Sequence, residues 1–242
     1  QSNYLASDES IDDFIDTDSS KISWTRGLKK ELGKIRHHSF DENFISQGSY
    51  RPFFKQWTYF NRTFNEYVFQ VPKIFPSDDL KNIAICVTGI GAGCEFTALV
   101  VEKSPCQDFL SKGQSFSLYI FDDMSTDSQS ENTNFFTEDD SPRIQRRDAI
   151  TDAGLAHFQE AYIEITITKE DLFYYVYGLL HSSDYRERNA DNLGKELPRI
   201  PRVKSAVEFR AFSKAGRNLA QWHLNYETVQ PYPLTIDAKG VL

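Results

Sequence analysis

The hydrophobic pattern changes its period part-way along the chain, and this change restricts the fold more than any other feature. Before Thr168, aromatic and β-branched residues gather in short runs that end at Gly or Pro, which is typical of strands. After it, apolar residues recur at helical spacing. Strands in one part and helices in another predict an α+β fold, not the alternation of a parallel α/β sheet. We expect one domain at 21–242, with a β-rich half at 21–140, built on a twisted mixed or antiparallel sheet, and a mainly helical half at 141–242.

Local signals refine this division. We expect strands at 50–60, 67–71, 82–88, 96–101, 115–121 and 162–168. Thr168 and Asp171 match a capping box that opens a helix. Ser183 is expected to cap a second helix that ends near Gly194, and Ser213 a third.

Acidic residues are concentrated in two segments. The net charge of −8 argues at first against a nucleic-acid partner, because the proteins that bind one are usually basic. Residues 1–20 and 122–140, however, hold 13 acids and no Lys or Arg, and the other 203 residues have a net charge of +5. We expect 1–20 to be an acidic linker or arm and 122–140 to be a mobile acidic loop. The acidity therefore describes two segments and not the body of the protein.

Basic residues form three clusters that could contact phosphate groups. Charge runs are often only solvated surface, and this alternative holds for each cluster. Arg51, Lys55 and Arg62 are expected to be structural, since they alternate with aromatic residues expected in the core. The candidate contacts are Arg143, Arg146 and Arg147 first, then Lys29, Lys30 and Lys34, and then Arg199, Arg202 and Lys204.

Motifs for catalysis or metal binding are weak in this sequence. The run Gly89-Ile-Gly91-Ala-Gly93 lacks the ending of a phosphate-binding loop and is expected to be a turn between strands. There is no HExxH pair and no GxSxG elbow. Three Cys without CxxC spacing indicate buried free thiols in a reducing compartment, and His181 and His223 are expected to serve packing or a helix end. We therefore expect no catalytic residue, no metal site and no bound cofactor in this chain.

Several strings of residues together resemble one family. Their order and spacing match the C-terminal specificity, or target recognition, region of Type ISP restriction–modification enzymes from about residue 22 to residue 233. The most specific string is 175–188, which continues to 197–201. The strings are Tyr50-Arg-Pro-Phe53 with Trp57-Thr-Tyr59, Ile85-Cys-Val-Thr-Gly-Ile-Gly91, Phe116-Ser-Leu-Tyr119, Tyr175-Val-Tyr-Gly-Leu-Leu-His-Ser-Ser-Asp-Tyr-Arg-Glu-Arg188, Leu197-Pro-Arg-Ile-Pro201 and Ala215-Gly-Arg-Asn-Leu-Ala-Gln-Trp-His-Leu-Asn-Tyr-Glu227.

The resemblance implies a non-catalytic part of a longer cytoplasmic polypeptide. Such a polypeptide carries a nuclease, a helicase–translocase and an N6-adenine methyltransferase upstream, and uses S-adenosylmethionine, ATP and Mg²⁺. A first residue other than Met agrees with this expectation. The partners implied are double-stranded DNA and the upstream domains, with no membrane. In this interpretation, the acidic stretch 122–140 is an insertion.

Two alternatives belong to other functional classes. Asp79 and Lys81, like Asp237 and Lys239, match half of a metal-dependent nuclease motif. Mg²⁺-dependent nicking of plasmid DNA that is lost in Asp79→Ala would support this alternative. The other alternative is an acidic protein-interaction module. Retention of a basic protein, together with no binding to any duplex, would favour it.

Overall fold

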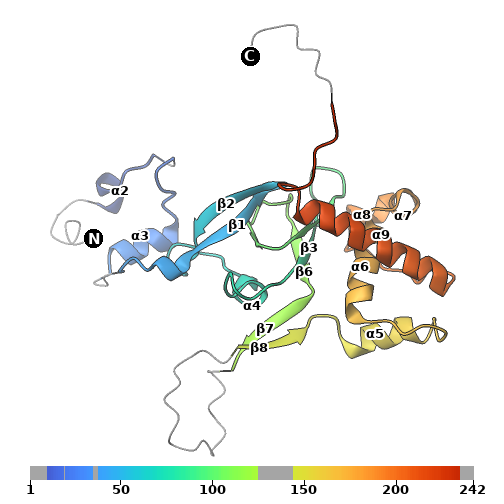
Figure 1. Ribbon diagram of the computed structural model, residues 1–242. Coiled ribbons are helices and arrows are strands. Elements are labelled where there is room, and N and C mark those ends of the chain that lie inside the picture. Colours follow the sequence, from blue (N-terminus) through green and yellow to red (C-terminus); the bar gives the residue numbers. More distant parts are fainter. Residues whose placement is uncertain (1–9, 19, 35–37, 125–143, 235–242) are drawn as a thin grey trace, which may run out of the picture. The chain divides into compact units, whose positions relative to one another are not determined.

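The computed structural model describes residues 10–18, 20–34, 38–124 and 144–234 (Figure 1). The chain separates into two compact units, and each combines segments that are distant in sequence. Unit 1 contains residues 1–82, 103–106 and 119–147, and unit 2 contains residues 83–102, 107–118 and 148–242. The sheet-forming residues of the first half are therefore divided between the two units. No helix among the described residues is long and apolar enough to cross a membrane.

Unit 1 is built around a β-hairpin. Strand β1 (Ile45–Arg51) pairs antiparallel with β2 (Phe54–Tyr59), and β1 also pairs in parallel with the short β5 (Ser104–Pro105). A second sheet joins β7 (Tyr119–Asp123) to β8 (Ile144–Asp148). The short helices are α2 (Ile11–Phe14), α3 (Arg26–Leu32), η1 (Glu42–Phe44) and α4 (Val71–Ile74).

Two expectations for unit 1 differ from the structure. The single strand expected at 50–60 is the last part of β1, a turn and β2. Pro52 and Phe53 form the turn, and Phe53 has a positive φ of 57°. The strand expected at 67–71 is wrong, since a turn leads there into α4, with a Pro in its first turn. Within the acidic arm, Ser10 caps α2, and Asp12 pairs with Lys29 of α3.

Unit 2 packs helices on a small antiparallel sheet. Strand β3 (Ala84–Val87) lies between β4 (Ala98–Val101) and β6 (Gln114–Ser117), and all residues of β3 and β4 are buried. The helices are α5 (Asp152–Gln159), α6 (Lys169–Leu180), α7 (Ser183–Arg188), α8 (Ala190–Leu193) and α9 (Ala206–Leu224). The expected strands at 82–88 and 96–101 are confirmed, whereas 115–121 is divided between β6 and β7. The glycine-rich run 89–93 is the expected turn between β3 and β4.

Helices α6 and α9 form the core of unit 2 and lie side by side (Figure 1). A Cβ atom added to Gly216 would lie 2.0 Å from the carbonyl oxygen of Tyr174, and one added to Gly178 would lie 2.3 Å from that of Phe212. The two helix backbones therefore meet at these glycines. Phe209 is fully buried and stacks on Tyr175 with ring centroids 4.7 Å apart.

The capping box at Thr168 and Asp171 is confirmed, but three other expectations for unit 2 are wrong. The last helix begins at Ala206, seven residues before Ser213, because Ser205 and Glu208 form its capping box. Ser213 lies inside α9 and donates to the carbonyl oxygen of Asp171. The segment 162–168 is irregular and not a strand. The second helix is capped by Ser182 in place of Ser183, and Asn189 separates α7 from α8.

Sheets in the first half and helices in the second confirm the α+β class. Each half also contains an element of the other type: β8 lies in the part expected to be mainly helical, and α3 lies in the part expected to be β-rich. The first two residues of the expected acidic loop 122–140 belong to β7, and most of the loop lies outside the described residues.

Candidate nucleic-acid interface

The first basic cluster lies on an exposed strand of unit 1. All five residues of β8 are exposed, and they include Arg146 and Arg147. Because successive side chains of a strand point to opposite faces, the two guanidinium groups have different surroundings. The Arg146 guanidinium lies over the ring of Tyr119, 4.4 Å from its centroid, and Arg147 Nε donates to Asp122 over 2.5 Å. Arg143 lies outside the described residues.

The second cluster belongs to α3, also in unit 1. Thr25 caps this helix, and the buried Leu28 anchors it, which leaves Lys30 exposed. Lys29 pairs with Asp12, and Lys34, just past the end of the helix, pairs with Glu31. Lys30 is therefore the most accessible cation of this cluster for a phosphate group.

The third cluster lies in unit 2 on the irregular segment before α9. Arg199 is exposed and pairs with Glu196 at 2.9 Å, and Arg202 donates to the carbonyl oxygen of His157 at 3.1 Å. The Lys204 side chain is exposed, while its backbone N–H donates to Glu208. The three clusters are thus distributed over both units, with two of them in unit 1.

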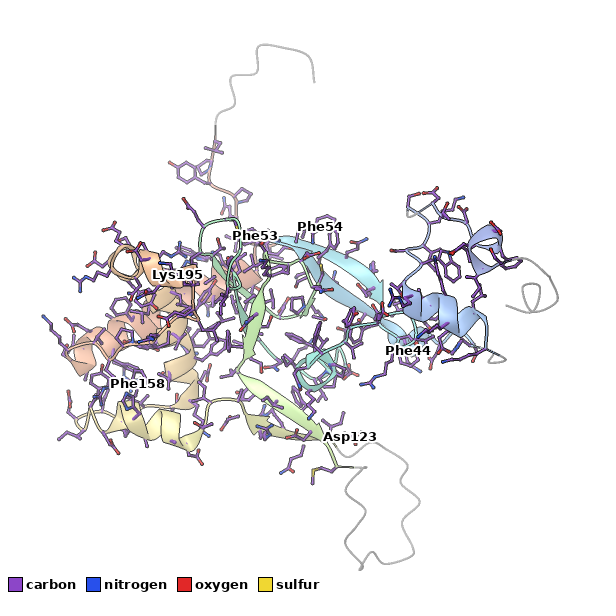
Figure 2. All side chains as sticks on the ribbon, turned by 180° about the vertical axis from the view of Figure 1, so that it is seen from behind. Phe44, Phe53, Phe54, Asp123, Phe158 and Lys195 are labelled. Carbon is purple, nitrogen blue, oxygen red and sulfur yellow. The ribbon has the colours of Figure 1, made fainter. Side chains whose placement is uncertain are left out.

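Exposed aromatic side chains on the β1–β2 hairpin were not anticipated from the sequence. The aromatic residues alternating with Arg51 and Lys55 were expected in the core, yet Phe53, Phe54 and Trp57 are 49%, 55% and 69% exposed. Phe44 lies at one end of the hairpin, and Phe53 and Phe54 lie at the other (Figure 2). The Arg51 guanidinium lies 4.3 Å from the centroid of the Tyr50 ring, a cation–π contact within the hairpin. The signal available in the sequence was the density of aromatic residues in a short hairpin.

Part of this aromatic surface is concave. A cavity of about 470 Å³, which we call the aromatic pocket, opens on one face of the hairpin. It is lined by His38, Ser39, Phe40, Ile45, Trp57, Thr58, Tyr59 and Phe64.

The candidate nuclease residues are exposed in the structure. Lys81 Nζ donates to the carbonyl oxygen of Asp78 at 3.1 Å, and Asp79 is exposed beside it. Asp237 and Lys239 lie outside the described residues. Over the described ranges, no three His, Cys, Asp or Glu side chains come together in a way that could hold a metal ion.

The buried Cys86 thiol and two partly buried imidazole groups serve packing. Cys86 is buried, and burial raises the pKa of its thiol to about 12, but Cys94 is exposed, which corrects the expectation of three buried thiols. His181 and His223 pack edge-on against Tyr177, with ring centroids 4.7 and 6.0 Å away, as expected. Tyr177 Oη lies 2.5 Å from His223 Nδ1 and accepts from the backbone N–H of Val100.

A family model named the Type ISP C-terminal specificity domain matches residues 2–241. The chain belongs to this family. A search of curated proteins finds no match for this specificity domain.

Solved structures of longer chains contain a similar domain. A DrdV–DNA complex, solved by cryoEM, matches with 33% identity and a TM-score of 0.74 over 86% of this chain and 18% of that one. A nuclease-deletion mutant of the Type ISP restriction–modification enzyme LlaGI, in complex with a DNA substrate mimic, matches with 31% identity and a TM-score of 0.67 over 90% of this chain and 17% of that one. The ATP-dependent Type ISP restriction–modification enzyme LlaBIII, bound to DNA, matches with 28% identity and a TM-score of 0.71 over 91% of this chain and 14% of that one. The specificity domain thus spans less than a fifth of each of these chains.

Proposed function

We propose that this specificity domain recognises a target sequence in double-stranded DNA for a Type ISP restriction–modification enzyme. The observation that carries the proposal is the family match over residues 2–241, together with similar domains in solved enzymes that are bound to DNA. In this function the domain contributes binding and no catalytic step. It directs the N6-adenine methyltransferase and the ATP-dependent translocase and nuclease of the same cytoplasmic polypeptide. Those upstream domains would use S-adenosylmethionine, ATP and Mg²⁺.

The basic clusters supply contacts to phosphate groups, and other side chains read base edges in the major groove. We place the first phosphate contacts at Arg146 and Arg147, because β8 exposes every residue. Stacking on Tyr119 holds the Arg146 guanidinium in place, so that less side-chain entropy is lost when it binds. Arg147 is paired with Asp122, so it has to contact the phosphate while keeping this ion pair or exchange Asp122 for the phosphate. Lys30 and the exposed cations at 199–204 are secondary contacts.

The experiment that tests this proposal measures duplex binding at several salt concentrations. The double variant Arg146→Ala/Arg147→Ala should weaken binding of the target duplex. It should also flatten the dependence of log K on log salt by about one unit for each lost phosphate contact. A matched control, Arg188→Ala/Lys214→Ala, removes two exposed positive charges of unit 2 and should leave the slope unchanged. An unchanged slope in the arginine variant would remove β8 from the interface, and equal binding of all duplex sequences would contradict target recognition.

A further inference from the structure

The aromatic pocket has a wall that is fixed by its own contacts. Tyr59 and Trp57 lie two residues apart on β2 and therefore on the same face, and Ile45 of β1 is paired with Tyr59. The hydroxyl of Tyr59 accepts from the backbone N–H of Asp41 at 3.3 Å. Phe44 and Phe64 contact the Tyr59 ring edge-on, with centroid distances of 5.9 and 5.7 Å. The Tyr59 ring is thus held in one orientation before any ligand arrives.

Flat ring surfaces in the pocket remain open to solvent. Phe40 is stacked on Tyr59, with centroids 5.5 Å apart and an interplanar angle of 17°, yet it is 67% exposed. Trp57 is 69% exposed although it lies in the middle of β2. Leaving this apolar area in water forgoes the stabilisation that burial would give, at about 25 cal/mol for each Å². The volume of about 470 Å³ lies within the range of small-ligand sites, about 300–1,000 Å³.

A basic helix borders the pocket. His38 lines the pocket, and its Nε2 atom lies 3.5 Å from a carboxylate oxygen of Glu31 on α3. Lys30 and Lys34 lie on either side of Glu31 in sequence, and both are exposed. Aromatic ring faces beside Lys side chains are the combination that binds single-stranded nucleic acid, because bases stack on the rings while cations attract the backbone.

We propose that the aromatic pocket binds an unpaired nucleobase by stacking it on Trp57 and Phe40. This inference rests on the proposed DNA-binding function and adds a ligand site to it. A paired base cannot enter, since its faces are covered by its neighbours in the helix; a base extruded from the duplex or in a displaced strand can. The chemistry favours a base over a protein segment: five of the eight lining residues carry an aromatic ring, Ile45 is the single aliphatic one among them, and every nucleobase offers a π-face.

The test compares oligonucleotides that differ only in pairing. A duplex with one unpaired adenine or thymine should bind the 242-residue chain more tightly than the fully paired duplex. It should also quench the fluorescence of Trp57 in a Trp24→Phe/Trp222→Phe background, where Trp57 is the one tryptophan left. Trp57→Ala should weaken binding of the unpaired-base duplex by about 5- to 150-fold, the loss that removal of one base–aromatic stack causes. Trp57→Phe keeps a ring and should retain most of the affinity.

Trp222→Ala is the matched control, because Trp222 is similarly exposed, at 64%, but lies on α9 in unit 2. It should leave the binding of both duplexes unchanged. Equal affinity for the two duplexes and no effect of Trp57→Ala, with binding still weakened by the Arg146 and Arg147 substitutions, would overturn this inference and leave the proposed function standing. If neither duplex binds, the proposed function fails. In that case a single-stranded oligonucleotide tests the stacking site by itself, and binding that is equal for the parent and for Trp57→Ala would overturn it.

A protein segment is the other possible occupant of the pocket. Hydroxyl-radical footprinting read by mass spectrometry, which reports on Trp57 separately from other residues, distinguishes the two in a longer polypeptide that includes upstream domains. Protection of Trp57 before DNA is added would overturn the inference, whereas protection that appears only with the unpaired-base duplex supports it.

Discussion

At the scale of single residues, the partly buried His181 makes stability depend on pH. Burial lowers the pKa of His181 from 6.5 to about 4, and its Nε2 atom is buried without a hydrogen-bond partner. The unfolded chain therefore takes up a proton near pH 6.5 that the folded chain takes up only near pH 4. Since the unfolded state binds more protons in this window, stability is complete above pH 6.5 and falls as the pH drops towards 4.

The variant His181→Phe isolates this effect. It keeps a ring beside Tyr177 but cannot take up a proton, so its stability should change less between about pH 7 and about pH 4.5 than that of the parent. After discounting for partial exposure, we expect a difference of about 1–2 kcal/mol in the change of unfolding free energy. Urea unfolding at each pH measures it. His223, whose pKa burial also lowers, should keep part of the pH dependence in the variant, and identical pH profiles would contradict this role of His181.

At the scale of elements, the start of a helix can be predicted from a few neighbouring residues, whereas a strand depends on another strand with which it pairs. Thr168 and Asp171 predict the start of α6, because both hydrogen bonds of the capping box form within four residues. Ser213 also matches a cap, but the equally local box of Ser205 and Glu208 begins α9 earlier. Two candidate caps in one segment cannot be ranked without the tertiary contact of Ser213 with Asp171.

The segment 162–168 has the composition of a strand but pairs with no strand among the described residues. The side chain of Gln159 takes that place: its Nε2 donates to the carbonyl oxygens of Tyr162 and Ile165, and its Oε1 accepts from the N–H of Ile167. The backbone hydrogen bonds of this segment are thus made by one amide side chain in place of a neighbouring strand.

For the candidate site, the basic clusters could be predicted from the sequence, but the aromatic pocket could not, because an apolar residue is assigned to the core by default.

The contact between α6 and α9 gives a prediction at this scale. Gly216→Ala places a Cβ atom against the carbonyl oxygen of Tyr174, so the helices have to move apart. Such overpacking costs about 1–3 kcal/mol or more, and the urea midpoint should fall accordingly. Gly93→Ala is the control, since a Cβ atom there meets no other atom within 4 Å, and its midpoint should change little. Equal midpoints for both variants would show that the helix pair adapts without strain.

At the scale of the whole molecule, the net charge of −8 is an average of unlike segments. Fixed charges act on DNA over about a Debye length, roughly 10 Å at 0.1 M salt, so only those near the interface affect binding strongly. Acids between 127 and 140 precede Arg146 and Arg147 closely in the chain. Local charge, and not the total, should therefore set the affinity of this domain for DNA.

Two variants with the same change in net charge separate these effects. The first replaces Asp127, Glu131, Glu138, Asp139 and Asp140 by their amides, and the second does the same for the exposed acids Glu160, Glu164, Asp184, Glu187 and Asp191 of unit 2. The first should bind duplex DNA several-fold more tightly at low salt, with a gain that shrinks as salt screens the charges, while the second should change little. Filter binding over a salt series measures both. Equal gains in affinity for the two variants would mean that the total charge controls binding. The acidic segments would then lower the affinity of this domain for every duplex, wherever the contacts lie.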